Sequence, residues 1–169
     1  MVVGLVVGLG VTGCSGTAPE PTSTATSPVE TPSETATVDP TEDAEAEVLA
    51  AYRAYWAATV ALFAGNHDAA VYDGVAQGAI VEENLSQARY YEEYDLVLTG
   101  APTFSNETVT IDGDRATVLA CVDNSAWVPA EGEVTGEIEP VQAGGLVLER
   151  IDGTWLATDS TPAPEGFTC

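Results

Sequence analysis

Apolar positions between residues 41 and 64 recur at steps of three and four, which places them along one stripe of a helix. The stripe consists of Val48, Tyr52, Tyr55, Trp56, Thr59, Val60 and Phe63. An Asp-Pro-Thr-Glu run at 39–42 offers an N-cap, a proline at the first helical position and a glutamate that caps in return. Gly65 and Asn66 then stop the pattern. The sequence therefore predicts one helix over residues 41–64.

A second helical pattern covers residues 68–94 and is divided into two pieces. The breaks fall near residues 73–74 and at Gly78, because glycine disfavours the continuation of a helix. One face of the second piece is apolar and carries Ile80, Leu85 and Ala88. Two consecutive helical pieces are therefore expected after the first helix.

After residue 95 the pattern changes to an alternation of apolar and polar positions, which is typical of half-buried strands. The segments with this pattern are 96–99, 107–111, 115–122, 146–151 and 154–158. Tight turns at 112–114 and 152–153 join the last four segments into two antiparallel hairpins. The glycines, prolines and four glutamates of residues 129–145 predict a long hairpin loop or a frayed edge. Helices followed by an antiparallel meander predict an α+β fold, with helices on one face of a curved sheet.

The net charge of the chain excludes some classes of function. The 169 residues carry 27 acidic side chains against four arginines and no lysine, a formal net charge of −23. Binding of nucleic acid or of anionic lipid headgroups needs clusters of basic side chains, so neither is expected. A hydrophobic fraction of 45% is ordinary for a globular protein, so the acidity does not indicate a disordered chain.

The first eleven residues are uncharged and apolar. They are too few to cross ~30 Å of hydrocarbon as a helix, but they suit the apolar region of a secretory signal. The run that follows, Val11-Thr12-Gly13-Cys14, resembles the bacterial lipobox, in which the cysteine thiol receives a diacylglycerol. The resemblance implies a signal peptide over 1–13, lipidation of Cys14, and a location on the extracytoplasmic side of the cell membrane, held by the lipid anchor alone.

Residues 14–40 predict a disordered tether behind the lipidated cysteine. Serine, threonine and proline occupy 16 of the 26 positions from 15 to 40. Such a composition buries too little apolar surface to offset the entropy of ordering the chain. We therefore expect one folded domain over residues 41–169.

The order of elements in residues 41–169 resembles the nuclear transport factor two-like superfamily, which includes the ketosteroid isomerase and polyketide cyclase families. The resemblance is carried by Tyr52, Tyr55 and Trp56 on the first helix and by the turns Asp112-Gly113-Asp114 and Asp152-Gly153-Thr154-Trp155. It implies a cone-like roll, in which the N-terminal helices pack on a strongly curved antiparallel sheet around an apolar pocket. The expected pocket lining is Tyr52, Tyr55, Trp56, Phe63, Tyr90 and Tyr94.

A narrower likeness and the cysteine count predict a disulfide. The run Ala120-Cys121-Val122-Asp123, the second turn and the terminal Cys169 look like small secreted or lipid-anchored actinobacterial proteins of this superfamily. With Cys14 lipidated, Cys121 and Cys169 remain as an even pair in an oxidising compartment. The alternative is two free thiols. Two cysteines and one distant histidine do not make a zinc site, and neither a metal nor a cofactor is expected.

His67 and Asp68 are candidates for acid–base chemistry, since a histidine beside a carboxylate suits a general base. The pair follows the glycine that ends the first helix, where Asp68 suits the N-cap of the next one. We therefore expect no catalytic role for His67 and assign no catalytic residue.

The acidic loop at 129–145 lacks the residue spacing of calcium-binding loops, so we interpret it as a solvated loop.

Three functions from different classes fit these observations. The first is a lipid-anchored binding or interaction module, not an enzyme, whose partner is a small apolar ligand or an envelope protein. The second is an isomerase- or cyclase-type enzyme in which a pocket aspartate, Asp95 or Asp123, works with a pocket tyrosine. The third is an accessory domain that forms a homodimer through the sheet face. The lining and the ionisable groups of the pocket discriminate among them.

Overall fold

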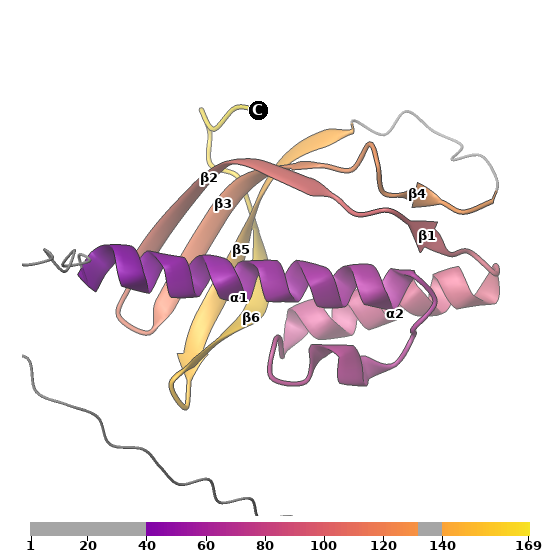
Figure 1. Ribbon diagram of the computed structural model, residues 1–169, viewed down its shortest axis with the longest axis horizontal. Coiled ribbons are helices and arrows are strands. Elements are labelled where there is room, and N and C mark those ends of the chain that lie inside the picture. The colour runs from indigo at the N-terminus through magenta and orange to yellow at the C-terminus, as the bar shows by residue number, and fades with distance from the viewer. Residues whose placement is uncertain (1–39, 132–139) are drawn as a thin grey trace, which may run out of the picture. The chain divides into compact units, whose positions relative to one another are not determined.

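The computed structural model of the chain describes residues 40–131 and 140–169. The predicted signal peptide, Cys14 and the tether up to residue 39 lie outside the described residues. The fold is α+β, with helices first and an antiparallel sheet after them (Figure 1). Within the described ranges, no helix is both long enough and apolar enough to cross a bilayer.

The first helix, α1 (Pro40–Phe63), matches the predicted helix to within one residue at each end. Most of its stripe is buried, while Trp56 and Val60 are half-buried. The buried members are Val48, Tyr52, Tyr55, Thr59 and Phe63. The helix ends because Gly65 adopts a φ of +99°, in the left-handed region that glycine enters without strain. The stripe thus fixes the face of α1 that meets the sheet.

The predicted break in the second helical region is confirmed. Its first piece is a short 3₁₀ helix, η1 (Ala69–Tyr72), and its second is α2 (Ala79–Glu93). Asp68 caps η1 by accepting a hydrogen bond from the Ala70 amide at 3.0 Å. Between the two pieces, residues 75–77 run beside the last strand, with an isolated parallel bridge between Ala76 and Ala157.

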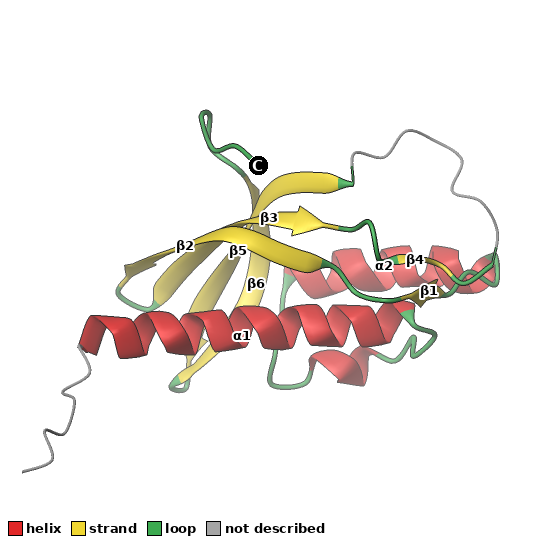
Figure 2. Cartoon of the chain, turned by 45° about the horizontal axis from the view of Figure 1, so that its top comes forward, coloured by secondary structure: helices red, strands yellow, loops and turns green. Residues whose placement is uncertain are grey.

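Four strands form one antiparallel sheet in the order β2-β3-β5-β6. Their bounds are β2 (Thr103–Asp112), β3 (Arg115–Asp123), β5 (Val141–Ile151) and β6 (Thr154–Pro162). A separate two-stranded sheet pairs β1 (Leu98–Thr99) with β4 (Val128–Pro129). The α1 helix crosses one face of the large sheet, and α2 lies beside it against β6 (Figures 1 and 2).

Both predicted hairpin turns are confirmed. Asp112 pairs with Arg115, and Ile151 pairs with Thr154. In the second turn Asp152 and Gly153 both have positive φ, as a two-residue turn between twisted strands requires.

The prediction of a loop over residues 129–145 is wrong at its C-terminal end. Residues 141–145 begin β5 and pair in register with residues 119–123 of β3. Two adjacent glycines and a scarcity of large apolar side chains gave this segment the composition of a loop. Neighbouring strands supply the hydrogen bonds and packing that the segment's own sequence lacks. Residues 132–139 lie outside the described residues.

A disulfide joins Cys121 of β3 to Cys169, as the cysteine count predicts. Their Cα atoms lie 5.6 Å apart across a sequence separation of 48 residues. Asn106 of β2 donates a further hydrogen bond to the Thr168 carbonyl at 3.1 Å. The bridge therefore holds the C-terminal tail against the sheet.

Candidate functional site

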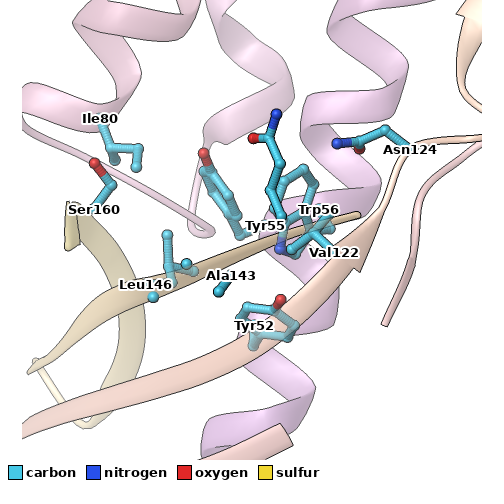
Figure 3. Close-up of a pocket in the computed structure, with 12 residues that line it drawn as sticks. Tyr52, Tyr55, Trp56, Ile80, Val122, Asn124, Ala143, Leu146 and Ser160 are labelled. Carbon is cyan, nitrogen blue, oxygen red and sulfur yellow. The ribbon is translucent and has the colours of Figure 1, made fainter. Parts of the chain in front are cut away.

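A cavity of about 210 Å³ lies between α1 and the sheet (Figure 3). Its walls are the side chains of Tyr52, Tyr55 and Trp56 from α1, with Ile80 from α2. Residues of β3, β5 and β6 form its floor, and the labelled Asn124 and Ser160 lie at opposite ends of the view. The full lining is Tyr52, Tyr55, Trp56, Ile80, Val122, Asn124, Gln142, Ala143, Gly144, Gly145, Leu146 and Ser160.

The cavity exists in part because residue 144 is glycine. Gly144 pairs with Ala120 on β3, and both lie on the sheet face that also carries the buried Val118 and Leu146. A Cβ atom added at Gly144 would meet nothing within 4 Å. The backbone there does not require positive φ. The missing side chain therefore leaves space under α1 that the fold does not otherwise fill.

Gly145 has the opposite surroundings. A Cβ atom on this residue would lie 2.7 Å from Leu119 Cδ2 and 2.7 Å from Thr161 Cγ2. Both contacts are shorter than real Cβ contacts, so the Leu119 and Thr161 side chains would have to shift to admit a side chain. The two glycines thus have separate roles: Gly144 leaves the cavity open, and Gly145 allows close packing on the other face.

Hydrogen bonds fix the position of the Tyr55 side chain. Asn84 of α2 donates one hydrogen to the Tyr55 hydroxyl at 3.0 Å and the other to the Tyr72 hydroxyl at 2.8 Å. Thr59 donates to the Tyr55 carbonyl at 2.9 Å, so the Tyr72 hydroxyl donates to Thr59 at 3.0 Å. This closed network joins α1, η1 and α2 and fixes the position of the ring that faces the cavity.

Burial raises the pKa of both tyrosines that line the cavity. Loss of solvation raises the pKa of Tyr55 to about 12, although the hydrogen bond from Asn84 opposes the increase. Burial likewise raises the pKa of Tyr52 to about 12. The Trp56 indole lies close enough to the Tyr52 hydroxyl to oppose this increase in the pKa. The two groups are not in hydrogen-bonding geometry, so the indole N–H has no hydrogen-bond partner among the described residues. Both phenols are therefore neutral at physiological pH.

Besides the two phenols and the Trp56 indole, the polar side-chain groups of the lining are two amides and one aliphatic hydroxyl. Asn124, Gln142 and Ser160 contribute them, and the Asn124 Oδ1 atom is buried without a hydrogen-bond partner in the described part of the chain. Among the described residues, no Asp, Glu, Arg or His side chain lines the cavity. The described lining thus offers aromatic faces, aliphatic surface and neutral hydrogen-bonding groups.

Three of the six residues expected to line the pocket do so, namely Tyr52, Tyr55 and Trp56. Phe63 lies two helical turns further along α1 and packs against Tyr91 and Trp127, with ring centroids 5.1 and 5.7 Å apart. Tyr90 and Tyr94 are exposed on α2 and contact one another with ring centroids 4.7 Å apart. Helical periodicity located the aromatic stripe on α1. It did not show how far along the stripe the cavity extends.

None of the candidate acid–base residues is among those that line the cavity. His67 is half-buried in the turn before η1, and its Nε2 atom has no partner among the described residues. Asp95 is exposed and has a positive φ. Asp123 accepts hydrogen bonds from the Ser125 hydroxyl and amide, and these lower the pKa of its carboxyl. Asp123 therefore stabilises a turn as a carboxylate.

No group of three or more His, Cys, Asp or Glu side chains is placed to hold a metal ion in the described ranges. Of the acidic residues at 131–139, Glu131 is exposed and the other three lie outside the described residues.

The sequence did not reveal the floor of the cavity. Gln142 and Gly144 were assigned to a loop, and Ser160 lay beyond the predicted end of its strand. One usable signal was present: a glycine inside a strand often marks a close approach or a ligand. That signal needs the strand to be recognised first.

Comparison with known proteins gives no family. No family model matches the sequence, and no curated protein matches it. Among solved structures, the intermembrane-space region of the chloroplast protein ARC6 is 16% identical, with 70% of this chain and 93% of that chain covered and a TM-score of 0.43. A de novo designed β-sheet protein is 13% identical, with 73% and 95% covered and a TM-score of 0.38. Neither likeness is close enough to carry an argument.

Proposed function

We propose that this chain is a lipid-anchored, extracytoplasmic module whose folded domain binds a small organic molecule in the cavity beneath α1. The observation that carries the proposal is the space left at Gly144 beneath three aromatic side chains. An engineered apolar cavity of about 150 Å³ holds benzene, so about 210 Å³ is enough for a somewhat larger guest. Apolar walls with a few fixed polar groups are typical of ligand sites.

The cone-like shape and the kinship with the nuclear transport factor two-like superfamily belong to the same proposal. A long helix lying across a four-stranded antiparallel sheet, with a cavity between the layers, supports both. The isomerase-type alternative has no observation in its favour: the described lining offers tyrosines but no carboxylate. Homodimerisation through the sheet face remains a prediction.

The binding site is tested with indole, a neutral aromatic probe. Backbone amide resonances of the isotopically labelled chain are followed as indole is added. The proposal predicts saturable shifts at cavity residues such as Tyr55, Val122 and Leu146. Shifts confined to the exposed Tyr90 and Tyr94, or the absence of any saturable shift, would exclude the cavity as the binding site.

The anchor is tested by fractionation. In a bacterium that exports and lipidates proteins, the wild type is expected in the membrane fraction because acyl chains on Cys14 hold it there. Cys14→Ala is expected to be released or left unprocessed. Identical behaviour of the two proteins as soluble material would contradict the anchor and leave the cavity proposal intact.

A further inference from the structure

The aromatic walls of the cavity form a corner. The Trp56 ring is inclined at 70° to Tyr52 and at 71° to Tyr55, with centroids 6.4 and 5.6 Å away. Figure 3 shows the Tyr55 and Trp56 rings side by side, with the Tyr52 ring below them. Aromatic faces carry partial negative charge and attract cations, most strongly for tryptophan. A guest in this corner can therefore contact more than one electron-rich surface.

The charges around the cavity also favour a cation. The chain has a net charge of −23, and no arginine lies in the described lining. Three of the four arginines pair with carboxylates: Arg53 with Glu107, Arg115 with Glu149 and Arg150 with Glu47. An anionic guest would find no positive partner in this lining and would enter a negative field.

Arg53 is the basic group nearest the walls, with its guanidinium 5.7 Å from the centre of the Tyr52 ring. It contacts Glu107 through both guanidinium NH₂ groups, which offsets its charge. Burial is the main reason that the pKa of Tyr55 is raised, and the carboxylate of Glu83 adds to it. At Tyr52 the charges of Glu107 and Arg53 act on the pKa in opposite directions. Negative charge thus acts on the Tyr55 wall, and the ion pair leaves little net charge beside Tyr52.

The kind of cation follows from the absence of a carboxylate in the described lining. A primary ammonium brings three N–H donors that need acceptors when they leave water, and the unpartnered Asn124 Oδ1 atom of the described lining would satisfy one of them. A quaternary ammonium has no N–H group and presents only methyl or methylene groups around its charge. Aromatic surface alone can receive such a group.

We propose that the cavity selects a small organic cation of the quaternary ammonium class over anions and neutral molecules of the same shape. This inference rests on the proposed function, because it specifies the ligand of the same cavity.

The test compares choline with 3,3-dimethylbutan-1-ol, which replaces the charged nitrogen by carbon and keeps the shape. Affinities are measured by the amide shifts used for indole. Choline is expected to bind at least about tenfold more tightly, and its advantage is expected to shrink as salt is added. Equal affinities, or tighter binding of the alcohol, would overturn the inference while the cavity proposal stood. If choline, the alcohol and indole all fail to bind, the proposed function fails as well.

Two variants separate cation–aromatic contact from other causes. Trp56→Leu keeps apolar bulk but removes the strongest aromatic face, and it is expected to weaken choline by about fivefold or more and the alcohol by less. Tyr94→Phe changes an exposed tyrosine outside the lining, so choline affinity should change by less than about twofold. An unchanged choline affinity in folded Trp56→Leu, or an equal loss in Tyr94→Phe, would contradict recognition by the aromatic faces. If Trp56→Leu does not fold, the choline-to-alcohol ratio in the wild type decides.

Discussion

At the scale of single residues, one side chain can both pack in the core and line the cavity. Tyr55 packs in the core, accepts a hydrogen bond from Asn84 and presents its ring to the cavity. Aromatic residues at helical spacing are ordinarily core residues. Here they pack in the core and also line the cavity. The space depends on Gly144, whose missing side chain no pattern of large residues reveals.

The buried phenols predict a pH dependence of stability. The pKa of Tyr55 rises from 10.0 to about 12 on folding, so the folded state favours the neutral phenol. Its contribution to the free energy of unfolding is complete below pH 10 and is lost as the pH rises towards 12. Tyr55→Phe should therefore make the stability fall less steeply over this interval, as measured by urea unfolding.

At neutral pH the same variant loses one hydrogen bond, at a cost of about 1 kcal/mol. The matched control is Tyr94→Phe, which removes an exposed hydroxyl and should leave the free energy of unfolding at neutral pH unchanged. An unaltered slope in Tyr55→Phe between pH 10 and 12 would contradict burial of this phenol.

At the scale of elements, the C-terminal tail is held by a covalent bond more than by packing. The Cys121–Cys169 bridge closes a separation of 48 residues, which the chain-entropy estimate values at ~4 kcal/mol. The Cys121→Ser/Cys169→Ser double variant should lose about 2–5 kcal/mol in urea unfolding. Unchanged stability of the wild type under reducing conditions would contradict this role, and the double variant under the same conditions is the control.

The sequence predicted elements well where local signals agree. The first helix has a cap, a stripe and a stop signal, and its bounds lie within one residue of those expected. The two hairpin turns, at residues 112–115 and 151–154, have local sequences that favour tight turns. The first half of β5 was missed because pairing with β3 stabilises it, and that pairing joins residues distant in sequence. Most of the cavity floor was missed for the same reason.

At the scale of the whole molecule, the described domain combines a buried core with a cavity beneath α1. The sheet and α1 share a buried core that includes Val118, Leu146 and Leu148, while Gly144 leaves a gap within the same interface. Natural interiors are closely packed, so the space of about 210 Å³ beneath α1 leaves its wall atoms without packing partners that a bound guest would supply.

The most direct test of this account is the dissociation constant of indole for the wild type and for Gly144→Leu. The added leucine would occupy the open space at residue 144, so we predict that indole affinity falls by about tenfold or more while the fold is kept. The control is Thr110→Leu, which adds a leucine at an exposed position of β2 outside the lining and should bind indole like the wild type. Wild-type affinity in a folded Gly144→Leu protein would contradict the central claim that this cavity is the binding site.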